Sequence, residues 1–490
     1  MLDPARQDAI QSAVLQACDA FRGICGPMEY RDLVLAMLLV RVLSDVAASR
    51  DGQDAAVPGD ASYCVPDESR FGRLVAARDA AGLGKRIDAT LAAIEWANPG
   101  LRGVFQGISF NSTVLGNAEQ KERVLGRLLD AIDASALNFS ESASLGKEGA
   151  AFACDSLIRY AAELAGRWGG EFYTPPEVSQ LLARLMEPKS GEAIGDPCCG
   201  SGSLLIACSQ FARAKSGQDG CALLGQEKSG STLALAKMNM ALHGETHHQV
   251  EWGDTLRDPK LLDAAGGLKR FDVVVSSPPF SLRDWGHEVA ERDVHQRYRR
   301  GIPPRMAGDY AFISHMVETL APATGRMAAV VTLGVLFRTG AERRIREQLV
   351  RENLIDAVIA LPTKMFAHTA IPVAVLVLRK RKADDGVMFI DASRTYQHGK
   401  TQNVLRESDL SMIEDIYRQR QDVEPYARLV APTEIAANNF NLSVARYVAA
   451  TTDEETVDLN ALRAERAHLK SELARLEAKL SALLEEAGHA

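Results

Sequence analysis

Between residues 165 and 400, short apolar runs alternate with longer segments that have the periodicity of helices. The apolar runs have the length of buried strands and read EAIGD, CALLGQE, FDVVVSS, RMAAVVTL, DAVIALP and AVLVLRK. Helix-like segments such as PPEVSQLLARLM and STLALAKMNMALHG lie between them. This alternation predicts an α/β domain with a mainly parallel sheet covered on both faces. Ligands of such sheets bind beyond the carboxyl ends of the strands, so we expect the functional motifs there.

The flanking sequence predicts further domains. Residues 1–160 are expected to form a helical domain, because segments such as YRDLVLAMLLVRVLSDVAA are apolar over most of a helix surface. The α/β domain is predicted at 161–400, a connecting segment at 401–452 and a C-terminal helix at 453–490. Along that helix, a seam recurs at alternating three- and four-residue steps, with Arg466 at one position and leucines at the others: Leu462, Leu469, Leu473, Leu476, Leu480 and Leu483. This seam is typical of a coiled coil and favours a partner helix over packing on its own domain.

Composition restricts the class of protein. The 490 residues are 46% hydrophobic and 24% charged, which is enough to bury sizeable cores. No apolar run is long enough to span a bilayer, and the N-terminus lacks the features of a secretory signal. The eight cysteines form no CxxC pair, so no zinc site is indicated and a reducing, cytoplasmic location is expected. A net charge of −8 argues against a protein that grips DNA alone, unless a local basic surface or a partner compensates.

The segment AIGDPCCGSGSLLIA is predicted to form a glycine-rich loop between a strand and a helix. It contains Asp196, Gly200, Ser201 and Gly202. Glycines permit a tight turn and the close approach of a ligand to the backbone. The spacing is neither G-x-G-x-x-G nor a phosphate loop, so a dinucleotide, S-adenosylmethionine or no ligand all remain open. The carboxylate of Asp196 suits a ligand with an ammonium group better than a pyrophosphate.

Two more acidic residues follow later strands. Glu227 lies about 25 residues after the loop, in the range where an acid binds ribose hydroxyls. Asp254 ends the next strand-like run and can accept a hydrogen bond from an adenine amino group. Each alone is compatible with a solvated residue at a strand end. Together with Asp196, they favour a nucleoside-binding edge.

The buried run FDVVVS ends in Ser277, Pro278, Pro279 and Phe280. The prolines end the strand, because neither can donate a ladder hydrogen bond. The Ser277 hydroxyl and the Pro278 carbonyl then form a pair of acceptors, and Phe280 offers a ring for stacking. Two acceptors that hold both N–H bonds of an exocyclic amino group free its lone pair, which fits methyl transfer to that nitrogen. A proline turn that closes a strand accounts for the motif equally well by itself.

Several segments, in this order and spacing, resemble the modification subunit of type I restriction-modification systems: GGEFYTPPEVSQLL, DPCCGSGSLL, GQEKSGSTLALAKMNMALHG, GDTL, SSPPF and GDYAFISHMVETLAPATGRMAAVVTLGVLFRTGAERRIREQLV. The resemblance extends from about Tyr30 to the predicted coiled coil. It implies a Rossmann-like methyltransferase core that binds S-adenosylmethionine, releases S-adenosylhomocysteine and requires no metal. The catalytic tetrapeptide matches Ser277 to Phe280. The implied cofactor-binding residues are Phe172, Tyr173, Thr174, Pro175, Asp196, Gly200, Ser201, Gly202, Glu227 and Asp254.

Ser277 departs from the family pattern, since most such subunits have Asn there and methylate N6 of adenine. A Ser-Pro-Pro-aromatic motif is typical of enzymes that act on N4 of cytosine. The sequence therefore predicts N4-cytosine methylation, with N6-adenine as the alternative and an inactivating change as a further one. The mechanism expected is direct displacement on a flipped base. Arg297, Arg299 and Arg300, in the segment RDVHQRYRRGIPPR, are predicted to contact phosphates, although a solvated basic turn fits as well.

The resemblance also implies partners. These are double-stranded DNA, a specificity subunit that reads the sequence, a second copy of this chain and a nuclease-translocase subunit. The C-terminal seam is expected to bundle with helices of the specificity subunit. Three other functions stay open: a nicotinamide oxidoreductase, a non-enzymatic assembly scaffold, and a methyltransferase of RNA or protein.

Overall fold

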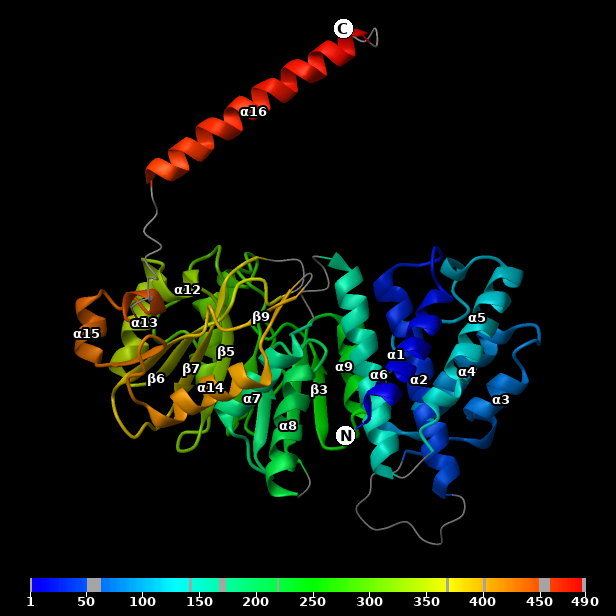
Figure 1. Cartoon of the computed structure of the whole chain (residues 1–490). Coiled ribbons are helices and arrows are strands. Elements are labelled where there is room, and N and C mark those ends of the chain that lie inside the picture. The colour runs from blue at the N-terminus through cyan, green and yellow to red at the C-terminus, as the bar shows by residue number, and fades with distance from the viewer. Residues whose placement is uncertain are drawn as a thin grey trace. The chain divides into compact units, whose positions relative to one another are not determined.

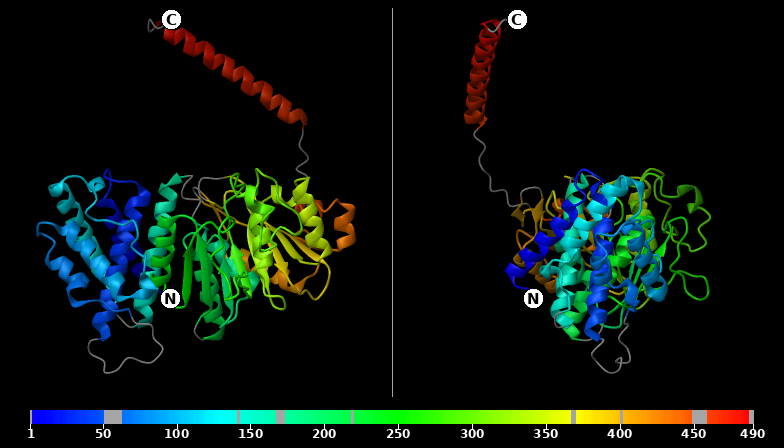
Figure 2. Two further views of the ribbon diagram at one scale, coloured as in Figure 1. Left: turned by 180° about the vertical axis from the view of Figure 1, so that it is seen from behind. Right: turned by 90° about the vertical axis from the view of Figure 1, so that its right-hand side faces the viewer.

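The structure is a computed structural model, which forms two units, Met1–Val448 and Ala449–Ala490. It describes residues 2–50, 63–140, 143–166, 173–217, 220–366, 370–399, 402–448 and 459–486. The first unit combines a helical domain with a sheet domain, which lie side by side in Figures 1 and 2. No helix of the described residues combines the length and apolarity needed to cross a membrane.

The helical domain packs around one apolar core that also includes one helix of the sheet domain. Its main helices are α1 (Pro4–Asp19), α2 (Pro27–Arg50), α3 (Phe71–Ala76), α4 (Leu83–Ala97), α5 (Ala118–Ile132) and α6 (Ala143–Leu164). Leu35, Met37 and Leu39 of α2 are fully buried, in agreement with the apolar surface expected of this helix. Leu235 and Met238 of α9 (Gly230–Leu242) complete the core, so the helical domain is docked on the sheet domain.

The sheet has nine strands in the order β11-β8-β6-β7-β5-β4-β1-β2-β3. Neighbours among the first five strands of the chain pair in parallel, whereas β7 runs antiparallel to β5 and β6. The strands are β1 (Ala193–Asp196), β2 (Ala222–Glu227), β3 (His248–Trp252), β4 (Val273–Ser276), β5 (Arg326–Thr332), β6 (Ile355–Ala360), β7 (Val373–Arg379), β8 (Val387–Asp391) and β11 (Ala427–Val430). β9 (Gln397–His398) and β10 (Asn403–Val404) form a separate pair.

Helices cover both faces of the sheet, which confirms the α/β fold expected from the sequence. One face packs against α7 (Pro176–Met186), α8 (Ser203–Ser216) and α14 (Glu407–Gln419). The other packs against α11 (Asp309–Glu318), α12 (Gly334–Phe337), α13 (Ala341–Arg351) and α15 (Pro432–Ala437). Because β1 to β5 are parallel, the loops after β1, β2, β3 and β4 leave the sheet at one edge. The predicted motifs follow those strands.

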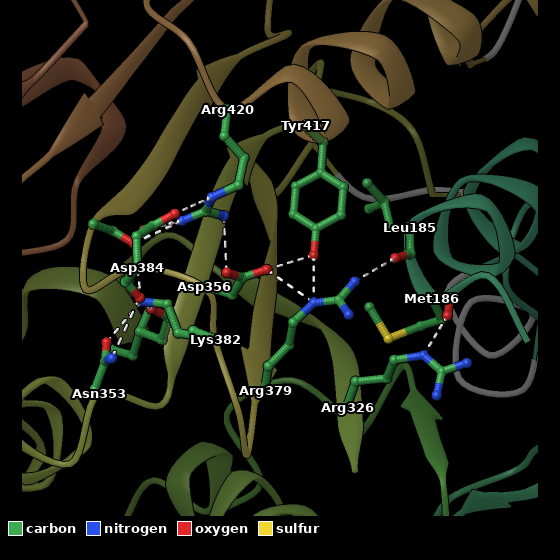
Figure 3. A network of polar contacts seen from close by, with 12 residues as sticks. Leu185, Met186, Arg326, Asn353, Asp356, Arg379, Lys382, Asp384, Tyr417 and Arg420 are labelled. Atoms are coloured by element: carbon green, nitrogen blue, oxygen red, sulfur yellow. Dashed lines mark hydrogen bonds and ion pairs between the residues drawn. The ribbon is translucent and has the colours of Figure 1, made fainter. Parts of the chain in front are cut away.

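The predicted connecting segment at 401–452 is wrong for residues 403–448, because they are part of the sheet domain. β11 pairs with β8, and a polar network fastens α14 to the sheet (Figure 3). In that network, the Asp356 carboxylate accepts hydrogen bonds from the Tyr417 hydroxyl at 2.5 Å, from Arg379 Nε at 3.0 Å and from Arg420 Nη1 at 2.9 Å. Asp356 is buried, so the loss of any partner would leave part of its charge uncompensated.

The second unit contains α16 (Leu459–Glu486). Leu469, Leu473, Leu476 and Leu480 are 55–57% exposed. The side chains of Leu462 and Leu483 lie outside the described residues. The described leucines of the seam are therefore all exposed to solvent. The coiled coil stays a prediction.

Candidate cofactor and methyl-transfer site

The loop after β1 has the tight backbone that its glycines predict. Gly200 and Gly202 have φ angles of 54° and 79°, in the left-handed region that favours glycine. A Cβ atom on Gly202 would lie 2.9 Å from Cε of Met240, so a larger residue would also displace the end of this α9 side chain. The Gly200 N–H donates to Glu227 Oε2 at 3.1 Å, which joins this loop to the end of β2.

Asp196 is the last residue of β1 and is only 1% exposed. Its Oδ1 atom accepts hydrogen bonds from the Cys198 N–H at 2.9 Å and from the Ser276 hydroxyl at 2.8 Å. Its Oδ2 atom is buried without a hydrogen-bond partner among the described residues. Burial raises the pKa of Asp196 to about 7, against the lowering effect of those two hydrogen bonds. An unsatisfied carboxylate oxygen of this kind fits a ligand ammonium group.

Glu227 ends β2 and is half-buried. Its Oε2 accepts the Gly200 N–H, and its Oε1 accepts the Ser229 N–H at 2.8 Å. Burial raises the pKa of Glu227, although these backbone donors oppose the shift. The carboxylate is thus held between the loops after β1 and β2, the position expected of an acid that binds a ribose.

Asp254 follows β3 and is held differently. Its Oδ1 accepts the N–H groups of Leu256 at 3.0 Å and Arg257 at 3.3 Å. Its Oδ2 lies 2.9 Å from Lys228 Nζ and 3.3 Å from Arg257 Nη1. Burial acts to raise the pKa of Asp254, but Lys228 and the backbone donors outweigh it and hold this pKa below the usual value. A ligand amino group would have to share Oδ2 with these cations.

The predicted catalytic tetrapeptide leaves the sheet beside the glycine loop. Ser276, the last residue of β4, is buried, and its hydroxyl donates a hydrogen bond to Asp196, the last residue of β1. This bond joins the residue before the tetrapeptide to the residue before the glycine loop. Ser277 is half-buried, and its hydroxyl has no hydrogen bond to any described residue. The Phe280 ring packs edge-to-face on Phe366, with centroids 5.6 Å apart and planes at 78°.

Sequence reasoning did not single out Ser276 or Phe366. Ser276 could have been found, because alternate residues of a strand face opposite sides and a serine within a run of valines is conspicuous. Phe366 comes from a distant loop, and no local pattern signals its contact with Phe280.

The segment predicted to line the methionine end of the cofactor is described in part. Phe172 lies outside the described residues. Tyr173, Thr174 and Pro175 precede α7 directly. The Tyr173 side chain packs against the core of the helical domain, and burial raises its pKa. This places it at the junction of the two domains, while its role toward a cofactor stays a prediction.

The prediction that Arg297 and Arg300 contact DNA is wrong for this structure, because both are buried in internal contacts. Arg297 donates to the carbonyls of Thr255 at 3.0 Å and Leu256 at 2.9 Å, and it pairs with Asp293. Arg300 lies 2.6 Å from carboxylate oxygens of two residues of other elements, Glu318 and Glu352.

Arg299 is half-exposed but paired with the same two glutamates as Arg300. Arg292 and Arg305 of the same stretch, and Arg283 before it, are exposed, and none has a side-chain partner among the described residues. They are therefore better placed to contact a phosphate. In the described part of the chain, no cluster of at least three His, Cys, Asp or Glu side chains is arranged to hold a metal ion.

The chain matches two known protein families. Residues 152–456 match the N-6 DNA Methylase family, and residues 10–132 match the HsdM N-terminal domain. The type I restriction enzyme MpnII methylase subunit of Mycoplasma pneumoniae is 32% identical over 375 residues, which cover 74% of this chain and 68% of that protein. The MjaVII methylase subunit of Methanocaldococcus jannaschii is 33% identical over 304 residues, or 59% of this chain.

The match spans about half the length of the Methanocaldococcus relative, 51%. Among solved structures, the type I restriction-modification system methyltransferase subunit from Streptococcus thermophilus superposes with a TM-score of 0.79 at 26% identity, covering 90% of this chain and 99% of that one. The fold is that of the S-adenosylmethionine-dependent methyltransferases. The chain belongs to the N-6 DNA methylase family and, within it, to the methylase subunits of type I restriction-modification systems.

Proposed function

We propose that this chain transfers a methyl group from S-adenosylmethionine to an exocyclic amino group of a base in DNA, as the modification subunit of a type I restriction-modification complex. The observation that carries the proposal is the hydrogen bond from Ser276 to Asp196. It joins the strand end that leads into the catalytic tetrapeptide to the strand end that leads into the cofactor loop. Donor and acceptor of the methyl group would therefore meet at one edge of the sheet.

The residues that we propose for the cofactor would contact it at both of its ends. Asp196 Oδ2 would accept the ammonium of the methionine part, and Glu227 would bind the ribose. Asp254 would accept the adenine amino group once Lys228, whose side chain is 64% exposed, moves aside. Gly200, Ser201 and Gly202 would form the floor, and Phe172, Tyr173, Thr174 and Pro175 would line the methionine end. When bound, S-adenosylmethionine supplies an activated methyl group on its sulfonium.

At the acceptor side, the tetrapeptide would hold the amino group of the flipped base. The Ser277 hydroxyl, which has no hydrogen bond to a described residue, and the Pro278 carbonyl would accept the two N–H bonds. Phe280, braced by Phe366, would stack on the base, and Pro279 would keep the turn rigid. These contacts position the nitrogen lone pair for in-line attack, and positioning of this kind is a large part of the catalysis of such transfers.

The identity of the base is a choice between two amino groups. The match to a family described as N-6 DNA methylases favours N6 of adenine over the N4-cytosine prediction. Ser277, shorter than the Asn of most relatives, keeps N4 of cytosine as the second candidate. We take adenine as the first.

Sequencing of host DNA for modified bases, with and without the gene, tests the proposal and separates the two bases. N6-methyladenine or N4-methylcytosine that disappears with the gene supports methyl transfer. The absence of any gene-dependent modified base would favour the non-catalytic scaffold. A Ser277→Ala chain should lose the modification, whereas Ser408→Ala, an exposed serine of α14, should keep it.

The partners we propose are double-stranded DNA, a specificity subunit, a second copy of this chain and a nuclease-translocase subunit. The exposed leucines of α16 would pack on helices of the specificity subunit. Arg283, Arg292 and Arg305 replace Arg297 and Arg300 as proposed phosphate contacts. Loss of assembly on replacement of Leu473 and Leu476 by Glu would support the role of α16.

A further inference from the structure

Two arginine side chains tie the turn that carries Asp254 to the chain that follows the catalytic tetrapeptide. We call residues 254–257 the adenosine turn and residues 281–308 the post-catalytic loop. The loop contains α10 (His287–Ala290) and the exposed arginines Arg283, Arg292 and Arg305. Its contacts with the adenosine turn determine where those arginines lie.

Arg257 forms the first tie and touches Asp254 itself. Its Nη1 atom lies 3.3 Å from Asp254 Oδ2 and donates to the Asp284 carbonyl at 3.3 Å. Its Nη2 atom lies 2.5 Å from Asp284 Oδ1 and 3.2 Å from Glu288 Oε1. The hydrogen bond that Arg257 donates to Asp284, together with those that it donates to Glu288 and Asp254, raises the pKa of Arg257. One guanidinium thus bridges the candidate adenine acceptor and two acids of the post-catalytic loop.

Gly286 leaves room for the Arg257 side chain, because it has no Cβ atom. This glycine has a φ angle of 94°, and a Cβ atom there would lie 2.9 Å from Cγ of Arg257. The backbone of the loop is therefore shaped to receive the arginine stem. The bridge is consequently a packed contact, in addition to a pairing of charges.

Arg297 forms the second tie and does so without touching Asp254. It donates hydrogen bonds to the carbonyls of Thr255 and Leu256. Its Nη2 atom also forms an ion pair with Oδ1 of Asp293 at 2.8 Å. The base of the loop is also fastened, since the Ser281 N–H donates to Asp309 at 3.1 Å. The loop is therefore anchored at its base and along its length. Only the Arg257 tie includes an atom that the proposed cofactor would contact.

We propose that Arg257 is a positioning residue that couples occupancy of the adenosine end of the site to the order of the post-catalytic loop. The inference rests on the proposed function, because it needs a cofactor whose amino group donates to Asp254. Asp254 Oδ2 is now shared by Lys228 and Arg257. The exposed Lys228 is the cation that a neutral amino group displaces at least cost. Among the described cations, Arg257 then remains alone on Asp254, and its pairing with that carboxylate is strengthened. The same guanidinium also pairs with Asp284 and Glu288, so the post-catalytic loop is held more firmly on the adenosine turn.

Bound cofactor would thus fix the loop before DNA arrives, and the loop would present its exposed arginines in a set arrangement. Preorganisation of this kind reduces the entropy lost when DNA binds. It would also favour binding of the cofactor before binding of the base.

Hydrogen exchange of the full chain, with and without saturating S-adenosylhomocysteine, tests the inference. In the wild type, amides of the glycine loop and of residues 284–297 should both exchange more slowly, the latter by about fivefold, at the low end of typical coupling between sites. In Arg257→Gln, the glycine loop should keep its protection and residues 284–297 should lose theirs. Glu291→Gln, a change of an exposed charged residue in the same loop, should behave as the wild type.

The outcomes separate this inference from the proposed function. Protection of the glycine loop without protection of residues 284–297 in the wild type would overturn the coupling and leave cofactor binding intact. Protection nowhere would overturn both. Asp284→Asn weakens the same bridge, which keeps its contact with Glu288, and it changes a side chain that is 87% exposed. It should therefore lose part of the protection of residues 284–297, which provides a second test if Arg257→Gln does not fold. Full loop protection in both variants would also contradict the role of Arg257.

Discussion

Asp196 and Asp254 follow parallel strands at the same edge of the sheet, and the protein treats them in opposite ways. Asp196 is buried with one oxygen unsatisfied among the described residues, and its pKa is raised to about 7. Asp254 is paired with Lys228 and Arg257, and its pKa is lowered. The difference shows that a carboxylate at a strand end does not by itself define a role. Asp196 lacks a cation and is suited to receive one from a ligand, whereas Asp254 already has two and is suited to transmit a change.

The largest effect should come from Asp196→Asn. If Oδ2 accepts the ligand ammonium, removal of the charge should weaken binding of S-adenosylhomocysteine by about 100-fold, as expected for loss of one partner of a buried charged pair. Asparagine can still accept from Cys198 and Ser276, so the fold should be kept. Isothermal titration calorimetry measures the affinity, and the melting temperature of the variant serves as its control. An unchanged affinity would remove Asp196 from the cofactor site.

The pH dependence of binding should be the next largest effect. Because the pKa of Asp196 is about 7 in the empty protein, the carboxylate becomes protonated below pH 7 and stops accepting an ammonium. The affinity for S-adenosylhomocysteine should therefore fall by up to about tenfold per pH unit below 7 and level off above it. The same titration of Asp196→Asn should be flat in this range. A wild-type affinity that does not change between pH 5.5 and about 8 would contradict the assignment.

The same shift has a consequence for the stability of the empty protein. A folded-state pKa above the unfolded value means that the folded chain binds the proton more tightly, so Asp196 costs stability above pH 7 and this cost disappears as the pH falls toward 4. Asp254 has the opposite sign, since its lowered pKa contributes stability that is present above the unfolded value and lost in acid.

Asp254→Asn should therefore have a smaller and different effect. It should reduce the affinity for S-adenosylhomocysteine by about fivefold, because a neutral hydrogen bond contributes about 1 kcal/mol. Unlike Asp196→Asn, it should also lower the free energy of unfolding by about 1 kcal/mol at pH 8, because Lys228 and Arg257 lose a charged partner. Denaturant titrations of the two variants side by side measure this contrast. Equal changes in the free energy of unfolding in Asp196→Asn and Asp254→Asn would contradict the contrast between the two carboxylates.

The smallest effect is expected of Lys228→Gln. This substitution removes the exposed cation that competes for Asp254 Oδ2, and exposed ion pairs contribute well under about 1 kcal/mol. The affinity for S-adenosylhomocysteine should rise by about twofold in low salt and stay unchanged in high salt. A loss of affinity would mean that Lys228 holds the ligand instead of competing with it.

The sequence predicted those features of the fold and the site that depend on local patterns. Alternation of apolar runs indicated the sheet, and the glycines, acids and prolines at strand ends indicated the edge where a site would form. It failed where the decisive partner is distant in the chain. Arg300 pairs with Glu318 and Glu352, and no pattern around Arg300 shows that its charge is already compensated. Likewise, β11 reads as a connecting segment until β8 supplies its hydrogen bonds.

A crystal structure of the chain with S-adenosylhomocysteine tests the central claim most directly. We expect the ligand ammonium within hydrogen-bond distance of Asp196 Oδ2, the ribose on Glu227, and the sulfur facing Ser277 and Pro278. A ligand bound in the reverse direction, with its amino acid part at Asp254, would contradict the account, as would a ligand bound away from this edge of the sheet.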